Sequence, residues 1–179
     1  MALLTAAALQ NETFREICGQ ASAKVCFGNP PYERWLTNSN KLLTMDETVI
    51  GVKTGFTDEA GRCLVSASVR NGITLICVTL NDRNDWQDHE VLYDYGFGQL
   101  SPQEVTFPAD WTLPVTGGTT GTAAVAPAET LTVGVKDGNM PAWSYQLNTP
   151  PFLYAPLTAG QEAGTWKLLL DGRVAAQGR

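Results

Sequence analysis

The sequence has little of what metal sites, disulfide frameworks and nucleic-acid interfaces require. Its 179 residues include one histidine, His89, and four cysteines without any Cys-x-x-Cys spacing, so the composition disfavours a zinc site. Only 12 Lys and Arg stand against 18 Asp and Glu, which gives a net charge of −6. Because a polyanion needs a clustered positive surface, we expect no nucleic-acid partner. Nothing in the sequence indicates a metal or a cofactor.

Long apolar runs are also missing. No stretch reaches the roughly 18 to 20 apolar residues that a bilayer span needs. The short apolar stretch 1–9 has no positive flank before it, so we interpret it as part of an amphipathic helix and not as a signal peptide. Hydrophobic residues at 44% and charged residues at 17% indicate a folded globular protein.

The N-terminal part favours a helix followed by irregular structure. Apolar residues recur at helical spacing from Ala2 to Ile17, and Gly19 is a suitable stop. Residues 20–48 contain a Gly-Asn-Pro-Pro break and a polar run, which predict irregular structure with at most a short strand near residue 25. Cys18 and Cys26 can meet only if the chain turns back between them, and the sequence leaves this open.

Three β segments follow, and they predict an antiparallel meander: Val49 to Thr57, Arg62 to Arg70, and Ile73 to Leu80. The second and third segments are apolar at nearly every position, which is typical of strands covered on both faces. The dipeptide Asn71-Gly72 between them predicts a two-residue hairpin.

That hairpin fixes how two of the cysteines relate to each other. It pairs Cys77 with Ser66 and Cys63 with Leu80. Side chains alternate between the two faces of a sheet, so the two sulfur atoms then point to opposite faces. We therefore predict no disulfide between Cys63 and Cys77.

A helix is predicted from Asp85 to about Phe97, with Asp82 or Asn84 as its cap and glycines at its end. We expect His89 on the polar face of this helix. The residues expected on its apolar face are Trp86, Val91, Leu92 and Tyr95.

Several other side chains near this helix are interpreted as structural. Arg62 and Arg83 are expected to be surface cations paired with Asp58, Glu59 or Asp85. The aromatic residues at helical spacing are expected to form core against the sheet: Trp86, Tyr93, Tyr95 and Phe97.

The composition changes near residue 100. From there the sequence consists of short β runs separated by Pro, Gly and Thr, and Asp171-Gly172 signals a further hairpin. We predict two domains, residues 1–99 and residues 100–179, of which the second is a small β-sandwich. Its expected strands are Trp111 to Val115, Thr130 to Val135, Trp143 to Leu147 and Trp166 to Leu170.

One segment of the predicted meander carries residues suited to binding a ligand. Lys53, Thr54 and Gly55 follow one another on its first strand, with Phe56 and Thr57 behind them. A cation, a hydroxyl group and an unobstructed backbone suit the carboxylate and amide groups of an extended peptide. Gly55 allows the backbone of such a ligand to approach closely.

With its flanking sequence, this segment resembles the penicillin-binding serine D-alanyl-D-alanine carboxypeptidases of low molecular mass. The motifs that carry the resemblance are Lys53 to Thr57, Glu59 to Val65, Asn40 to Leu43 and Tyr93 to Phe97. Three later segments look like the β-rich C-terminal domain of those enzymes: Leu147-Asn148, Leu153 to Leu157 and Gly164 to Gly172. The resemblance implies an α+β fold, in which part of a penicillin-binding, β-lactamase-like antiparallel sheet with covering helices precedes a small all-β sandwich.

The resemblance also shows what this sequence lacks. Enzymes of this family use a serine nucleophile and a lysine base in Ser-x-x-Lys, together with a Ser-x-Asn motif. No serine of the chain begins either motif; the serines are Ser22, Ser39, Ser66, Ser68, Ser101 and Ser144. We therefore expect a C-terminal part of a longer enzyme, without catalytic residues of its own. The strand Ile73 to Leu80 would then be an open edge, and we expect it to pair with a second copy or with the missing part.

The resemblance further implies a role for each residue of the segment. Lys53 would bind the terminal carboxylate of a peptidoglycan stem peptide, or the corresponding carboxylate of a β-lactam. Thr54 and Thr57 would supply hydroxyl groups, and the backbone N–H of Phe56 would be one donor of the oxyanion hole. The expected location is the cell envelope outside the cytoplasm, and we expect no membrane anchor within these 179 residues. The alternative hypothesis is a non-catalytic module that binds the cell wall or another protein.

Overall fold

The computed structural model describes residues 1–107, 110–128 and 130–179, and they divide into two compact units, Met1–Leu100 and Ser101–Arg179. Each unit is described by itself. Among the described residues, no helix combines the length and the apolar character needed to cross a bilayer.

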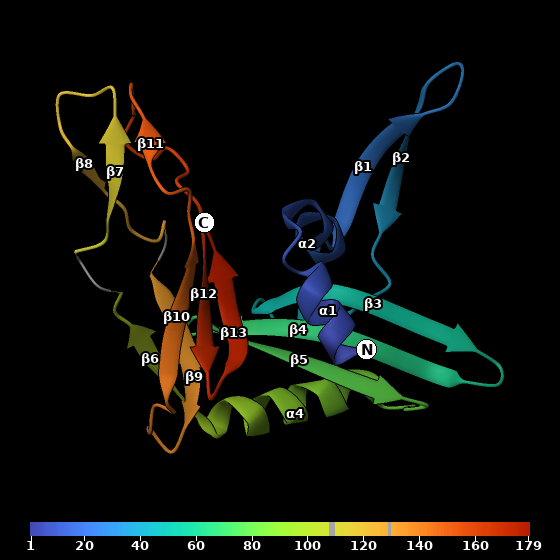
Figure 1. Ribbon diagram of the computed structural model, residues 1–179. Coiled ribbons are helices and arrows are strands. Elements are labelled where there is room, and N and C mark those ends of the chain that lie inside the picture. Colours follow the sequence, from blue (N-terminus) through green and yellow to red (C-terminus); the bar gives the residue numbers. More distant parts are fainter. Residues whose placement is uncertain (108–109, 129) are drawn as a thin grey trace. The chain divides into compact units, whose positions relative to one another are not determined.

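The first unit is built around a three-stranded antiparallel sheet (Figure 1). Its strands are β3 (Val49–Thr57), β4 (Gly61–Arg70) and β5 (Ile73–Leu80), in the order β3-β4-β5. The predicted meander is confirmed. Asn71 and Gly72 both have positive φ, as a two-residue hairpin turn requires, and Asn71 tolerates this better than most residues because its side chain is short.

The register of this hairpin is also confirmed. Cys63 lies opposite Leu80, and Cys77 lies opposite Ser66. The sulfur atoms of Cys63 and Cys77 are therefore on different faces of the sheet. All four cysteines belong to the described residues, and all four are free thiols.

Helices lie on the two faces of this sheet (Figure 1). On one face, α4 (Asp85–Gly98) packs against β4 and β5. On the other side of the sheet lie α1 (Ala2–Ala8) and α2 (Glu12–Gly19), which contact β5 and β3 respectively. The short helix α3 (Leu42–Met45) precedes β3 and places Leu42 in the core under α4. That core is formed by Leu42, Val49, Leu64 and Tyr93.

The prediction of one helix over residues 2–17 is wrong, because the helix is interrupted at residues 9–11. Asn11 is the N-cap of α2, and its side-chain oxygen accepts a hydrogen bond from the Phe14 N–H at 3.0 Å. The asparagine therefore starts a new helix in the middle of the apolar pattern. The expected stop at Gly19 is confirmed.

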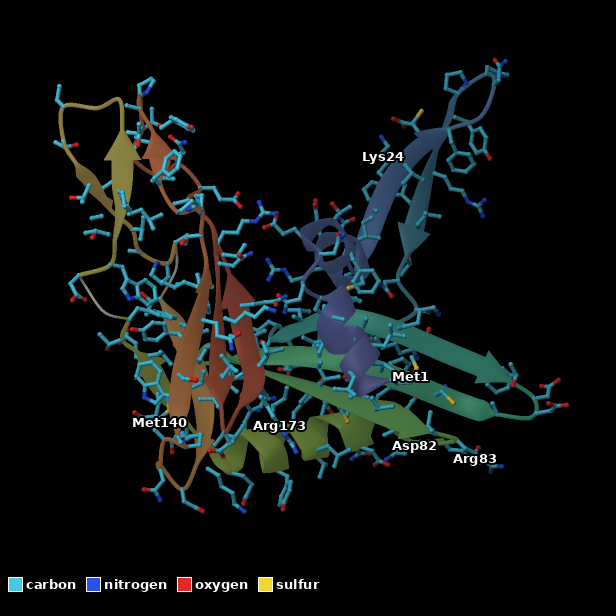
Figure 2. The ribbon with its side chains drawn as sticks, viewed as in Figure 1. Met1, Lys24, Asp82, Arg83, Met140 and Arg173 are labelled. Atoms are coloured by element: carbon cyan, nitrogen blue, oxygen red, sulfur yellow. The ribbon has the colours of Figure 1, made fainter. Side chains whose placement is uncertain are left out.

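The prediction of irregular structure over residues 20–48 is also wrong in part. The chain forms an antiparallel hairpin of β1 (Ser22–Phe27) and β2 (Tyr32–Thr37), and the Gly-Asn-Pro-Pro break is its turn. The hairpin projects from the unit near α2, and Figure 2 shows Lys24 on its outer part. Because two strands alone cannot enclose a core, apolar residues such as Trp35 stay exposed.

In the described residues of the second unit, the β-strands form three small sheets. Its elements are β6 (Leu100–Val105), β7 (Thr112–Thr116), β8 (Thr122–Ala124), β9 (Leu131–Lys136), β10 (Trp143–Asn148), β11 (Leu153–Tyr154), β12 (Thr165–Leu170) and β13 (Arg173–Gly178). The sheets are β6-β9, β10-β12-β13 and β11-β7-β8, and β11 runs parallel to β7.

The core of the second unit lies between the sheets β6-β9 and β10-β12-β13. It is formed by Val105, Val133, Val135, Trp166 and Leu168. Strands are present at all four segments where the sequence predicts them, and the Asp171-Gly172 turn joins β12 to β13 as predicted. Burial of a side chain such as Leu168, which is fully enclosed, contributes about 1.5–3 kcal/mol to folding.

Candidate ligand-binding strand

The segment Lys53–Thr57 lies on β3, and β4 is the only sheet neighbour of β3 in the described part of the chain. The outer edge of β3 therefore carries backbone groups that can pair with an extended ligand. Lys53, Gly55 and Phe56 are exposed, whereas Thr54 is half-buried. The segment thus lies at an accessible sheet edge, in a strand whose first half is anchored in the core through Val49.

The cation and the hydroxyl group approach this edge from two sides. Lys53 pairs with Val65 across the sheet and Thr54 pairs with Leu64, so their side chains start on opposite faces. The Lys53 ammonium donates a hydrogen bond to the carbonyl oxygen of Thr54, which brings its charge back to the strand. An anion at the edge of β3 can therefore meet the lysine from one face and the threonine from the other.

The hydroxyl group of Thr54 has a partner that the sequence analysis missed. The Oγ of Ser39 lies 2.9 Å from the Oγ1 of Thr54. Ser39 belongs to the loop between β2 and α3, and its side chain is exposed. The signal in the sequence was the polar run that contains Ser39, but no local pattern says which strand such a loop will meet.

Thr57 and Gly55 have different surroundings from Thr54. The Oγ1 of Thr57 accepts a hydrogen bond from the Ala60 N–H at 3.0 Å, so this hydroxyl group stabilises the β3–β4 turn while its proton stays available to a ligand. A Cβ atom at Gly55 would meet Cys63 at 3.8 Å, which is an ordinary contact. The fold of this chain therefore does not itself require glycine at position 55.

Arg62 takes one of the structural roles expected for it. It makes a two-pronged ion pair with Asp85, at 2.5 Å and 3.2 Å, and lies over the ring of Trp86. The Asp85 side chain is only 4% exposed, so this pair joins the start of β4 to the start of α4. Figure 2 places Asp82 and Arg83 where β5 gives way to this helix.

The face of α4 that contacts the sheet differs from the expected one. Its buried residues are Asp85, His89 and Tyr93, one turn apart, whereas Val91, Leu92 and Tyr95 are exposed. Trp86 and Phe97 pack against the core as expected. Asn84 is the N-cap but makes no capping hydrogen bond with its side chain, and Asp82 instead accepts a hydrogen bond from the Asn84 N–H.

His89, expected on the polar face, is fully buried in a chain of hydrogen bonds. Its Nδ1 lies 2.6 Å from the Oγ of Ser66, and its Nε2 lies 3.0 Å from the Oγ1 of Thr79. The Oγ of Ser66 also contacts the hydroxyl of Tyr93 at 2.5 Å. Burial lowers the pKa of His89, although Asp85, Asp82 and Asp88 act in the opposite direction. Because these groups are closed off from solvent, this serine and histidine pair is part of the core and not a catalytic pair.

A cavity of about 570 Å³ lies elsewhere in the first unit, beside α3 and α4. Its lining includes Asp46, Arg70 and Asp94, and Arg70 bonds both carboxylates, at 2.9 Å and 2.7 Å. Burial acts to raise the pKa of Asp46, but hydrogen bonds from Thr48 and the charge of Arg70 outweigh it and lower that pKa. No residue from Lys53 to Thr57 lines this cavity, so it is separate from the strand edge.

Metal binding was not expected from the sequence. Within residues 1–107, 110–128 and 130–179, no three His, Cys, Asp or Glu side chains come together in a way that could hold a metal ion.

Comparison with known proteins identifies the relatives of this chain. The family model for D-alanyl-D-alanine carboxypeptidase matches residues 1–84. The D-alanyl-D-alanine carboxypeptidase DacF of Bacillus subtilis is 28% identical over an alignment of 152 residues, which covers 80% of this chain and 38% of that protein. The D-alanyl-D-alanine carboxypeptidase DacB2 of Mycobacterium tuberculosis is 31% identical over 54% of this chain and 34% of that protein. The chain thus spans little more than a third of the curated relatives it matches.

Solved structures agree with this relationship. Penicillin binding protein 5 from Haemophilus influenzae matches 99% of this chain and 52% of its own chain, with a TM-score of 0.53 and 20% identity, which supports the fold alone. The Streptomyces K15 DD-transpeptidase is 30% identical over 54% of this chain and 40% of its own chain, with a TM-score of 0.50. The resemblance inferred from the motifs is confirmed: residues 1–84 match the D-alanyl-D-alanine carboxypeptidase family model, and the curated relatives carry the same description.

Proposed function

We propose that β3 is the carboxylate-binding strand of a serine-type D-Ala-D-Ala carboxypeptidase that acts on the stem peptides of peptidoglycan. The observation that carries this proposal is the exposed Lys53 on an edge strand, with the hydroxyl group of Thr54 at the same edge. A peptide that ends in D-Ala-D-Ala offers an extended backbone for the strand and a terminal carboxylate for the lysine. A β-lactam offers a corresponding carboxylate.

Each residue of the segment has a chemical task in this proposal. The ammonium group of Lys53 and the hydroxyl group of Thr54 donate charge-assisted hydrogen bonds to the ligand carboxylate. The hydroxyl proton of Thr57 is available to the surroundings of that carboxylate, because its oxygen is the atom used in the turn. Gly55 leaves room for the ligand backbone, and the N–H of Phe56 is a donor for the oxyanion that forms during acyl transfer.

The chemical step needs a nucleophile that we do not assign to this chain. None of its serines begins Ser-x-x-Lys, and Ser66 is enclosed beneath α4. We propose that these 179 residues bind the ligand without hydrolysing it. The same observation favours the second candidate, a cell-wall-binding module without enzymatic activity, which would use this strand edge in the same way.

Two further parts of the proposal concern the open edge at β5 and the location of the protein. β5 has β4 as its only sheet neighbour in the described ranges, and Leu80 at its end is 69% exposed. Pairing of this edge with a second copy or with another part of an intact enzyme stays a prediction. The proposed ligand lies in the cell envelope, so we propose an extracytoplasmic location.

Two measurements on the chain of 179 residues test this function. We expect acetyl-L-Lys-D-Ala-D-Ala to bind at least about tenfold more tightly than the same peptide with a C-terminal amide, because hydrogen bonds to a charged group contribute about 1.5–3 kcal/mol. Equal affinity for the two peptides would overturn the carboxylate-binding role. We also expect fluorescent penicillin to form no covalent adduct, as read by mass spectrometry. An adduct would show that the chain does contain a nucleophile.

A further inference from the structure

The loop that carries Ser39 is held in place by the two residues beside it. The Asn38 side chain donates hydrogen bonds to the carbonyl oxygens of Cys18 and Gln20, at 3.3 Å and 3.0 Å, and accepts one from the Asn40 N–H at 2.9 Å. Asn40 is 2% exposed, and its side-chain oxygen accepts a hydrogen bond from the Leu42 N–H at 3.2 Å. The two asparagines thus join the end of α2 to the start of α3.

Ser39 lies between these anchors and has a different environment. Its side chain is exposed, and the hydrogen bond described for it is the one to Thr54, at 2.9 Å. The neighbouring asparagines hold the loop without help from the serine. The position of the Ser39 hydroxyl group next to β3 is therefore set by a loop that is anchored on both sides of the serine.

The direction of the hydrogen bond between Ser39 and Thr54 decides whether Thr54 can also donate a hydrogen bond to an anion. A threonine hydroxyl has one proton to donate and two lone pairs that accept. If Thr54 donates that proton to Ser39, none is left for an anion. If Ser39 donates to the oxygen of Thr54, the Thr54 proton is free to point at a carboxylate, and the chain of two hydrogen bonds strengthens both.

We propose that Ser39 is a positioning residue, which donates its proton to Thr54 and so aims the Thr54 hydroxyl group at the carboxylate of the bound peptide. This inference rests on the proposed function and adds a residue to it. Ser39 acts through Thr54 and belongs to the loop between β2 and α3, not to the strand that binds the ligand.

The test compares peptide affinities of three single variants and one double variant of the full chain. Ser39→Ala removes the donor, and we expect about a fivefold loss of affinity for acetyl-L-Lys-D-Ala-D-Ala, the share of one hydrogen bond between neutral groups. Ser39→Thr keeps a hydroxyl group, and we expect it to restore most of the affinity. Thr54→Val removes the intermediate group, so adding Ser39→Ala to Thr54→Val should cause no further loss.

The same peptide with a C-terminal amide separates positioning from a general structural effect. Ser39→Ala is expected to leave the affinity for the amide unchanged, whereas a disturbed loop would weaken binding of both peptides. If the unmodified chain prefers the carboxylate peptide and Ser39→Ala keeps that affinity, the role of Ser39 is wrong and the proposed function stands. If the unmodified chain shows no preference, the proposed function itself fails. A full additional loss in the Thr54→Val background would also overturn the positioning role.

Discussion

The sheet of the first unit is expected to lose stability as the pH falls from about 7.5 to about 5.5, and His89 is the reason. Burial lowers the pKa of His89 in the folded protein below its usual value of about 6.5. The unfolded chain therefore binds a proton on His89 near pH 6.5, whereas His89 in the folded chain stays neutral until the pH is lower. The stabilising effect of the neutral, buried His89 is complete above about pH 6.5. It is lost as the pH falls toward the pKa of His89 in the folded protein. One proton limits the loss to about 1.4 kcal/mol per pH unit.

Hydrogen exchange of the β4 and β5 backbone amides, corrected for the intrinsic effect of pH, measures the free energy of opening this sheet. His89→Gln removes the titrating group and keeps a side chain that can hydrogen-bond Ser66, so its opening free energy should stay flat over the same range. Glu33 forms an exposed ion pair with Lys24 in the β1–β2 hairpin. Glu33→Gln removes the charge of Glu33 and is the matched control. An unmodified chain whose opening free energy does not change between the two pH values would contradict the neutral, buried histidine.

Replacing Lys53 with methionine is expected to reduce the affinity for acetyl-L-Lys-D-Ala-D-Ala about 10- to 100-fold. The variant keeps the apolar stem and removes the ammonium group, and a hydrogen bond to a charged partner contributes about 1.5–3 kcal/mol. Because Lys53 is exposed, the fold should tolerate the change. Isothermal titration of the variant and of the unmodified chain measures the difference.

Lys167→Met is the control for Lys53→Met. Lys167 is an exposed lysine on β12 in the second unit, and its replacement changes the net charge by the same amount. We expect this control to bind the peptide as the unmodified chain does. If both variants lost affinity equally, the lysine would act through the overall charge and not as a contact at β3.

The meander was predictable from the sequence because its signals are local. Asn71-Gly72 sets the turn, the turn sets the register, and the register sets the face of every side chain in β4 and β5. The local pattern of β segments and turns also predicted that Lys53 and Thr54 lie on a strand. The edge position of β3 and the contact of Thr54 with Ser39 depend on which elements become neighbours, which no local pattern contains.

The buried face of α4 was mispredicted because apolar residues alone were counted. β4 places Ser66 and Ser68 on the sheet face beneath the helix, and both are fully buried. Buried hydroxyl groups need partners: Ser68 finds one in Thr48, and the helix turns His89 and Tyr93 toward Ser66 and leaves Val91 in solvent. The two serines within an otherwise apolar strand were the signal that could have indicated this.

The helix break at residues 9–11 and the hairpin β1–β2 show a second limit of the sequence. Asn11 lies within a pattern of helical spacing, and its capping hydrogen bond to the Phe14 N–H outweighs continuation of the helix. In the hairpin, the strands carry no alternating pattern because neither face is enclosed by a core. Periodicity reports burial, and it is weak wherever burial is slight.

The most direct test of the account is a map of amide chemical shifts as acetyl-L-Lys-D-Ala-D-Ala is added to the isotope-labelled chain. The largest shifts are expected at residues 53–57 and at Ser39, and they should weaken when the C-terminal amide peptide replaces the acid. Shifts that cluster around the cavity of Asp46 and Arg70, or in the second unit, with none along β3, would contradict this expectation.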